Sequence, residues 1–109
     1  MSTPLRVLDA ARSVIDEVNR LLDARRPRLL YEVQLRESAE SIASNIREAR
    51  GRRRGPDRNQ FYRFARASSE ETDEHLFANC RANRLALPRY RRLHNRLATV
   101  IKMLNRLME

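Results

Sequence analysis

Residues 41–76 read SIASNIREARGRRRGPDRNQFYRFARASSEETDEHL. Apolar residues recur near the start of this stretch at spacings of four and three, as in a helix that packs along one side: Ile42, Ile46 and Ala49. Gly51 is a typical C-terminal cap, and Gly55-Pro56-Asp57 is typical of a turn that leads into a new helix. The stretch therefore predicts two helices joined by a short, arginine-rich turn.

Helical periodicity continues on both sides of this stretch. The first part of the chain carries one apolar stripe, formed by Leu5, Leu8, Ala11, Ile15, Val18 and Leu22. The last part carries another, formed by Leu93, Leu97, Val100, Leu104 and Leu107. Pro27 and Pro88 interrupt the pattern, because the residue before a proline is disfavoured in a helix. We therefore expect helices over residues 4–24, 27–50, 56–86 and 89–108.

Four helices with short connections favour one fold class. They predict a single all-α domain over residues 1–109, built as an antiparallel up-down-up-down four-helix bundle. The length of 109 residues suits one hydrophobic core. No apolar run approaches the length that spans a bilayer, and the N-terminal residues lack the apolar core of a signal peptide. A single cysteine, Cys80, suits a reducing compartment. We expect a cytoplasmic protein with no membrane association.

Positive charge is unevenly distributed along the chain. The formal net charge is +9, and 22 of the 23 basic residues are arginine. Residues 47–66 contain eight arginines and two acids, residues 67–80 contain four acids and no base, and residues 81–109 contain eight basic residues and one acid. Arginine binds phosphate groups in a bidentate manner and stacks on bases. This composition fits a polyanion partner, and it fits equally a genome rich in G and C.

The central turn is the candidate binding surface. Its candidate nucleic-acid-binding residues are Arg47, Arg50, Arg52, Arg53, Arg54 and Arg58, with Tyr62 as a possible stacking surface for a base. Two other interpretations remain open. The turn could be a solvated basic loop, or it could pair with acids such as Glu70, Asp73 and Glu74 of a neighbouring subunit.

The residues of the central stretch also resemble a known family motif. The pattern S-I-x-x-N-I-x-E-x-x-G-R is matched by residues 41–48 followed by Gly51 and Arg52. Upstream matches are Pro27, Tyr31, Gln34, Leu35 and Arg36. Downstream matches are Asp57, Phe61, Phe64, Ala65, Ser68, Ser69, Glu71, His75, Leu76, Ile101, Met103, Leu104 and Leu107. On these residues the chain resembles the 23S rRNA-intervening sequence proteins, also called four-helix bundle proteins.

The resemblance implies more than the residues themselves show. It implies an antiparallel four-helix bundle that assembles into a homopentameric ring. A more distant resemblance by fold is to the accessory variability determinant, which works with a reverse transcriptase and nucleic acid. The chain departs from the family pattern at Arg47, Ala49 and Ala67, two of which alter the shape and charge of the turn.

The polar positions of the motif are Asn45, Glu48, Ser68 and Glu71. They could form a binding pocket, or a polar network that fixes how helices or subunits pair. No set of residues typical of a catalytic site is present, and two histidines with one cysteine do not provide four zinc ligands. We expect no catalytic residues, no metal and no cofactor.

The sequence thus favours a non-enzymatic, homo-oligomeric bundle that binds RNA or DNA through its arginine-rich turns. Two alternatives stay open. One is a protein-interaction scaffold, such as an accessory factor of a reverse transcriptase. The other is an oligomer with no nucleic-acid ligand, whose arginines serve solubility and packing.

Overall fold

The computed structural model of the chain describes residues 3–24 and 28–109. Four helices account for most of them: α1 (Thr3–Asp23), α2 (Glu32–Arg50), α3 (Pro56–Arg81) and α4 (Leu87–Leu107). Within these residues there is no strand. The described part of the chain measures 44 × 22 × 20 Å. The expected all-α four-helix bundle is therefore what the chain forms.

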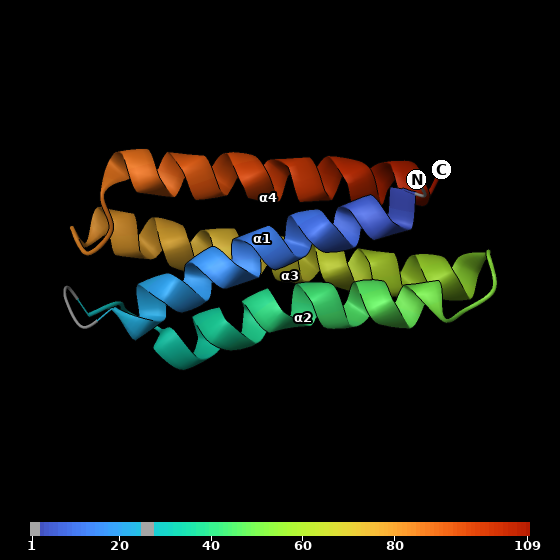
Figure 1. Ribbon diagram of the computed structural model, residues 1–109, viewed down its shortest axis with the longest axis horizontal. Coiled ribbons are helices and arrows are strands. Elements are labelled where there is room, and N and C mark those ends of the chain that lie inside the picture. Colours follow the sequence, from blue (N-terminus) through green and yellow to red (C-terminus); the bar gives the residue numbers. More distant parts are fainter. Residues whose placement is uncertain (1–2, 25–27) are drawn as a thin grey trace.

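Each helix packs on its two neighbours around a square. α2 contacts α1 and α3, and α4 contacts α3 and α1. Figure 1 shows that the start of α1, the α2–α3 turn and the end of α4 lie at one end of the bundle, which we call the turn end. The α1–α2 and α3–α4 connections lie at the opposite end, which we call the far end.

The core follows the apolar stripes of the sequence. Val7, Val14 and Val18 of α1 and Leu93, Val100 and Leu104 of α4 are fully buried. α2 contributes the large side chains of Leu35, Ile42 and Ile46. Between its own large residues Tyr62 and Leu76, α3 faces them with small or polar ones such as Ala65, Ser69 and Thr72, which are also fully buried. Small residues along α3 let α2 and α3 approach closely.

α2 begins at Glu32, whereas the sequence placed its start at Pro27, which lies outside the described residues. The delay follows from a contact between distant parts of the chain. The side chain of buried Asn79 accepts a hydrogen bond from the Leu30 N–H at 2.6 Å and donates one to the Leu30 carbonyl at 3.1 Å. Tyr31 then takes a left-handed conformation with φ of 57°. The segment before Glu32 is thereby held outside the helix.

α3 ends at Arg81, earlier than the expected residue 86. Asn83 adopts φ of 60°, and the Arg84 N–H donates to the Asn79 carbonyl at 2.9 Å. The Asn83 N–H donates to the Cys80 carbonyl at 3.1 Å, which completes a Schellman motif with asparagine in the left-handed position. α4 then begins at Leu87, two residues before the expected Arg89, because proline is tolerated in the first helical turn.

Candidate nucleic-acid interface

The α2–α3 turn is short and closely defined by its backbone. Gly51 caps α2 by donating its N–H to the Arg47 and Glu48 carbonyls, both at 3.2 Å. Gly55 adopts φ of 141°, which favours glycine, and Pro56 starts α3 in the position where proline needs no N–H. The turn therefore presents its arginines from a fixed backbone.

Arg58 reaches back from α3 to hold the end of α2. Its Nε donates to the Arg52 carbonyl at 2.9 Å and to the Ala49 carbonyl at 3.2 Å. Its Nη2 donates to the Arg52 carbonyl at 2.6 Å. Ala49 belongs to the last turn of α2, whose carbonyls a helix leaves without a partner in the helix, and Arg52 belongs to the turn that follows. Arg58 is thus a structural residue of the turn.

Arg52 is also engaged within the chain. It donates to Asp57 at 2.8 Å and to Glu48 at 3.0 Å, and these two hydrogen bonds, that to Asp57 first, raise its pKa. Its guanidinium group lies 4.4 Å from the centre of the Phe61 ring, in a cation–π arrangement. An arginine held by two carboxylates and a ring has little capacity left for a phosphate.

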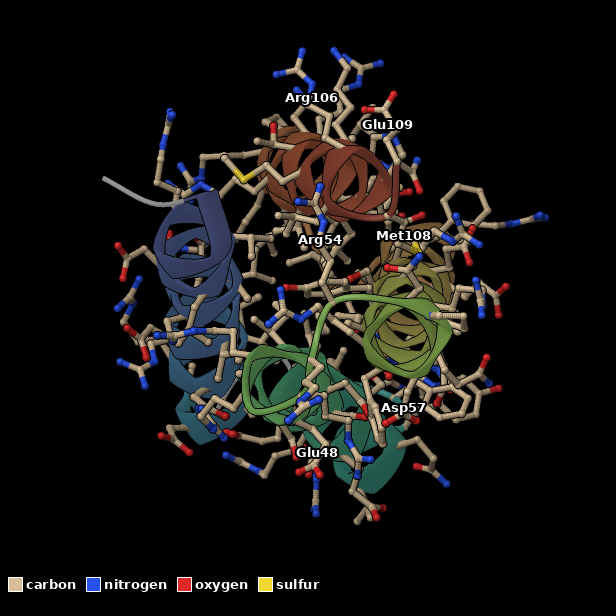
Figure 2. The ribbon with its side chains drawn as sticks, turned by 90° about the vertical axis from the view of Figure 1, so that its right-hand side faces the viewer. Glu48, Arg54, Asp57, Arg106, Met108 and Glu109 are labelled. Carbon is tan, nitrogen blue, oxygen red and sulfur yellow. The ribbon has the colours of Figure 1, made fainter. Side chains whose placement is uncertain are left out.

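The other four arginines of the turn remain available. Arg47, Arg50, Arg53 and Arg54 are exposed, and none has an ion-paired or hydrogen-bonded side-chain partner in the described part of the chain. We call them the free turn arginines. Figure 2 shows Arg54 over the centre of the turn end and Arg106 on α4 at the same end. Exposed Arg6, at the start of α1, adds to this positive charge.

Tyr62 does not provide the expected stacking surface, so that prediction is wrong. Its side chain is 1% exposed, in the core between α3 and its neighbours. Burial raises its pKa, and its hydroxyl has no hydrogen-bond partner among the described residues. Helical spacing groups Phe64 with Phe61, Ala65 and Ser68 on a predicted inward face. Phe64 is instead 44% exposed and packs edge-on against Phe61 with ring centres 5.7 Å apart. Phe64 is therefore the exposed aromatic side chain near the turn.

The polar motif residues do not converge on one site. The Ser68 hydroxyl donates to the Ser41 hydroxyl at 2.9 Å, and the Asn45 amide donates to the same hydroxyl at 3.0 Å. The first contact ties α3 to α2, and the second lies within α2. Glu48 instead pairs with Arg52, and Glu71 lies 3.4 Å from His75 on its own helix. The arrangement links two helices and shows no pocket formed by all four residues.

The basic residues of the far end are partly neutralised. Arg92 and Arg96 each donate to a different oxygen of buried Glu17, at 2.9 and 2.8 Å. Arg84 donates to the Arg28 carbonyl at 2.8 Å. Neutralisation is only partial here, because Arg20, Arg81 and Arg89 are exposed and have no ion-paired partner among the described residues. Arg25 and Arg26 lie outside the described residues.

Two general features complete the description. Among the described residues, no three His, Cys, Asp or Glu side chains gather as a metal site would require. None of the helices in this part of the chain combines the length and apolar character needed to cross a membrane.

Comparison with known proteins finds a family match over nearly the whole chain. The family model described as 23S rRNA-intervening sequence protein matches residues 3–106. The fold is similar to the crystal structure of a protein with unknown function from the S23 ribosomal protein family of Bacteroides thetaiotaomicron. That similarity has a TM-score of 0.89 and 21% sequence identity, and it covers 98% of each chain. Among curated proteins, no relative matches this chain.

Proposed function

The chain belongs to the 23S rRNA-intervening sequence protein family, and on this premise we propose that it binds RNA or DNA through the free turn arginines. In this proposal the protein is a non-enzymatic, cytoplasmic homo-oligomer, assembled as a homopentameric ring. The ligand is the phosphate backbone, so binding is independent of base sequence.

One observation carries the proposal: the turn divides its arginines between two tasks. Arg52 and Arg58 are used to fix the backbone: Arg52 pairs with Asp57, and Arg58 donates to the Arg52 carbonyl within the turn. The four free turn arginines project from that fixed backbone without partners among the described side chains. Like charges held this close repel one another, and an anion relieves that repulsion.

The phosphate backbone of a nucleic acid suits this surface better than a single small anion does. Several guanidinium groups spread over one end of the bundle match a ligand that carries charge at regular intervals. Oligomerisation strengthens the match, because each copy adds one turn and linked sites raise the effective concentration of the next contact.

The experiment compares two triple variants that lose equal charge. The first is Arg50→Ser with Arg53→Ser and Arg54→Ser at the turn end. The second is Arg20→Ser with Arg81→Ser and Arg89→Ser, three exposed residues toward the far end. Fluorescence anisotropy with labelled structured RNA and single-stranded DNA measures the affinity of each at one moderate salt concentration.

The proposal predicts that the turn variant binds at least about tenfold more weakly than the wild type, while the far-end variant stays close to it. Equal losses in the two variants would show that only total charge matters. Equally weak binding by the wild type and both variants would remove nucleic acid as the ligand.

A further inference from the structure

The face formed by α3 and α4 carries an acidic groove. Its α3 wall consists of Glu70, Asp73 and Glu74, and its α4 wall includes Leu97, Ala98 and Ile101. The hollow has a volume of about 280 Å³. Three carboxylates and an apolar floor lie together here, on a protein that is otherwise strongly basic. Such a surface suits a partner that offers positive charge on aliphatic stems.

The three carboxylates of the groove differ in how they are used. Asp73 is occupied, because it lies 2.8 Å from His94 Nδ1 and accepts from the Tyr90 hydroxyl at 3.2 Å. Glu70 and Glu74 are exposed, and neither has a basic partner among the residues that the structure describes. Two carboxylates therefore remain for a ligand.

α4 supplies the complementary charge on a row of exposed residues that shares Ala98 with the groove wall. Residues 87–107 contain six basic side chains and no acid. Arg91, Asn95, Ala98, Lys102 and Arg106 recur at spacings of four, three, four and four, and all five are exposed. We call this row the α4 stripe. Its positive ends flank the middle of the helix, where the groove lies.

We propose that the acidic groove receives the α4 stripe of a second copy of this chain. Glu70 and Glu74 then pair with the second copy's Lys102 and Arg91, and the stems of these cations cover the apolar floor. The inference rests on the proposed homo-oligomer and names the surface that holds it together. Each copy carries both halves, so the contact can be repeated from copy to copy.

The charge of the chain explains why two copies would associate through the acidic groove. Two chains that each carry +9 repel one another, and association needs local attraction that exceeds this repulsion. Residues 67–80, which form the α3 wall, are the acidic segment without a base. A contact between that wall and the α4 stripe places opposite charges together and weakens as salt increases.

The test reverses the charge of the groove and the charge of the α4 stripe in separate variants. Variant A carries Glu70→Lys and Glu74→Lys, which make the groove basic. Variant B carries Arg91→Glu and Lys102→Glu, which make the stripe acidic. All four residues are exposed, so both variants should keep the helical circular dichroism of the wild type. A control variant reverses the exposed acids Asp16 and Glu37, which lie on α1 and α2.

Mass is measured by analytical ultracentrifugation at about 100 µM without nucleic acid, since oligomer populations depend on concentration. We expect the wild type and the control to be oligomeric and variants A and B to be monomeric. An equimolar mixture of A and B should form species heavier than a monomer, because the groove of A matches the stripe of B, and the reverse. A ring with an odd number of alternating copies would keep one repulsive contact, so the mixture need not restore the wild-type mass.

Three results would overturn the inference: a monomeric wild type, a variant A or B with the wild-type mass, or a mixture of A and B that stays monomeric. The affinity comparison at the turn end is separate, since it uses other residues. If the wild type and both charge variants bind nucleic acid equally weakly while the mass results are as expected, the proposed ligand alone is refuted.

Discussion

Arg58 shows at the scale of one residue how the turn is held. Its guanidinium group donates to the Ala49 carbonyl in the last turn of α2 and to the Arg52 carbonyl in the turn that follows. We predict that Arg58→Ala lowers the free energy of unfolding by about 1–3 kcal/mol, because a charged donor is lost from carbonyls that have no other side-chain partner of this kind. Arg53→Ala, at an exposed residue of the same turn, should change it by less than about 0.5 kcal/mol. Urea denaturation of both variants measures the difference, and equal losses would contradict this role of Arg58.

Tyr62 leads to the prediction that removing a polar group does not lower the free energy of unfolding. Its ring is buried, but its hydroxyl has no partner among the described residues. Removing a buried hydroxyl that is unpaired costs nothing in hydrogen bonding. We therefore expect Tyr62→Phe to leave the free energy of unfolding unchanged or raise it by up to about 1 kcal/mol. Tyr62→Leu, which loses ring volume, serves as the destabilised comparison. A clear loss of stability in Tyr62→Phe would show that the hydroxyl is bonded.

Ionisation of the Tyr90 hydroxyl makes the stability of the fold depend on pH in the alkaline range. Burial, followed by the nearby Asp73 carboxylate, raises the pKa of Tyr90 to about 12. An unfolded tyrosine titrates near 10, so the folded state binds the proton more tightly. The resulting stabilisation is complete below pH 10 and is lost as the pH rises from about 10 through 12. Thermal unfolding across this range should show the wild type losing more stability than Tyr90→Phe, and parallel profiles would contradict the assignment.

Some of these residue roles could not be read from the sequence. The cluster of arginines was evident, but its division into structural and free members depends on where the carbonyls of Ala49 and Arg52 lie. Helical spacing placed Phe64 on the inward face, and Tyr62 was interpreted as an exposed stacking surface because it lies close to the arginines in the sequence. The structure reverses both, since the inward row of α3 follows small residues such as Ala65 and Ser69.

At the scale of the elements, the α2–α3 pair depends on side chains that are small. Ser69 is fully buried, and its hydroxyl donates to the Ala65 carbonyl of its own helix at 2.9 Å. We predict that Ser69→Leu lowers the free energy of unfolding by about 1–3 kcal/mol, because the added atoms push α3 away from the core. Ser69→Ala, which keeps the size, should stay within about 1 kcal/mol of the wild type. Urea denaturation distinguishes the two, and a tolerated leucine would mean that the helices are less closely packed.

The helices themselves were largely predictable, and the reasons are local. The α2–α3 turn was predicted correctly because Gly51, Gly55 and Pro56 determine it within a few residues. The start of α2 was predicted wrongly, because the side chain that holds Leu30 outside the helix belongs to Asn79, 49 positions away in the sequence. The end of α3 was missed because asparagine at position 83 takes the conformation that glycine usually provides.

At the scale of the whole molecule, the antiparallel bundle concentrates charge that the sequence spreads out. It brings the start of α1 and the end of α4 beside the α2–α3 turn, so Arg6 and Arg106 join the free turn arginines at one end (Figure 1). The acidic part of α3 lies between the two ends. The acidic groove is thus set apart from the phosphate surface, while Arg106 belongs both to the turn end and to the α4 stripe.

The salt dependence of binding tests the central claim most directly. Anisotropy titrations of single-stranded RNA over a series of salt concentrations give the slope of log K against log salt, which reports the number of phosphates neutralised. We predict a steep negative slope for the wild type. It should shrink by about 2 units when Arg50, Arg53 and Arg54 are changed to serine, since each contact contributes about 0.7. The far-end variant at Arg20, Arg81 and Arg89 should keep the wild-type slope. An unchanged slope in the turn variant would contradict the claim that the free turn arginines contact phosphate.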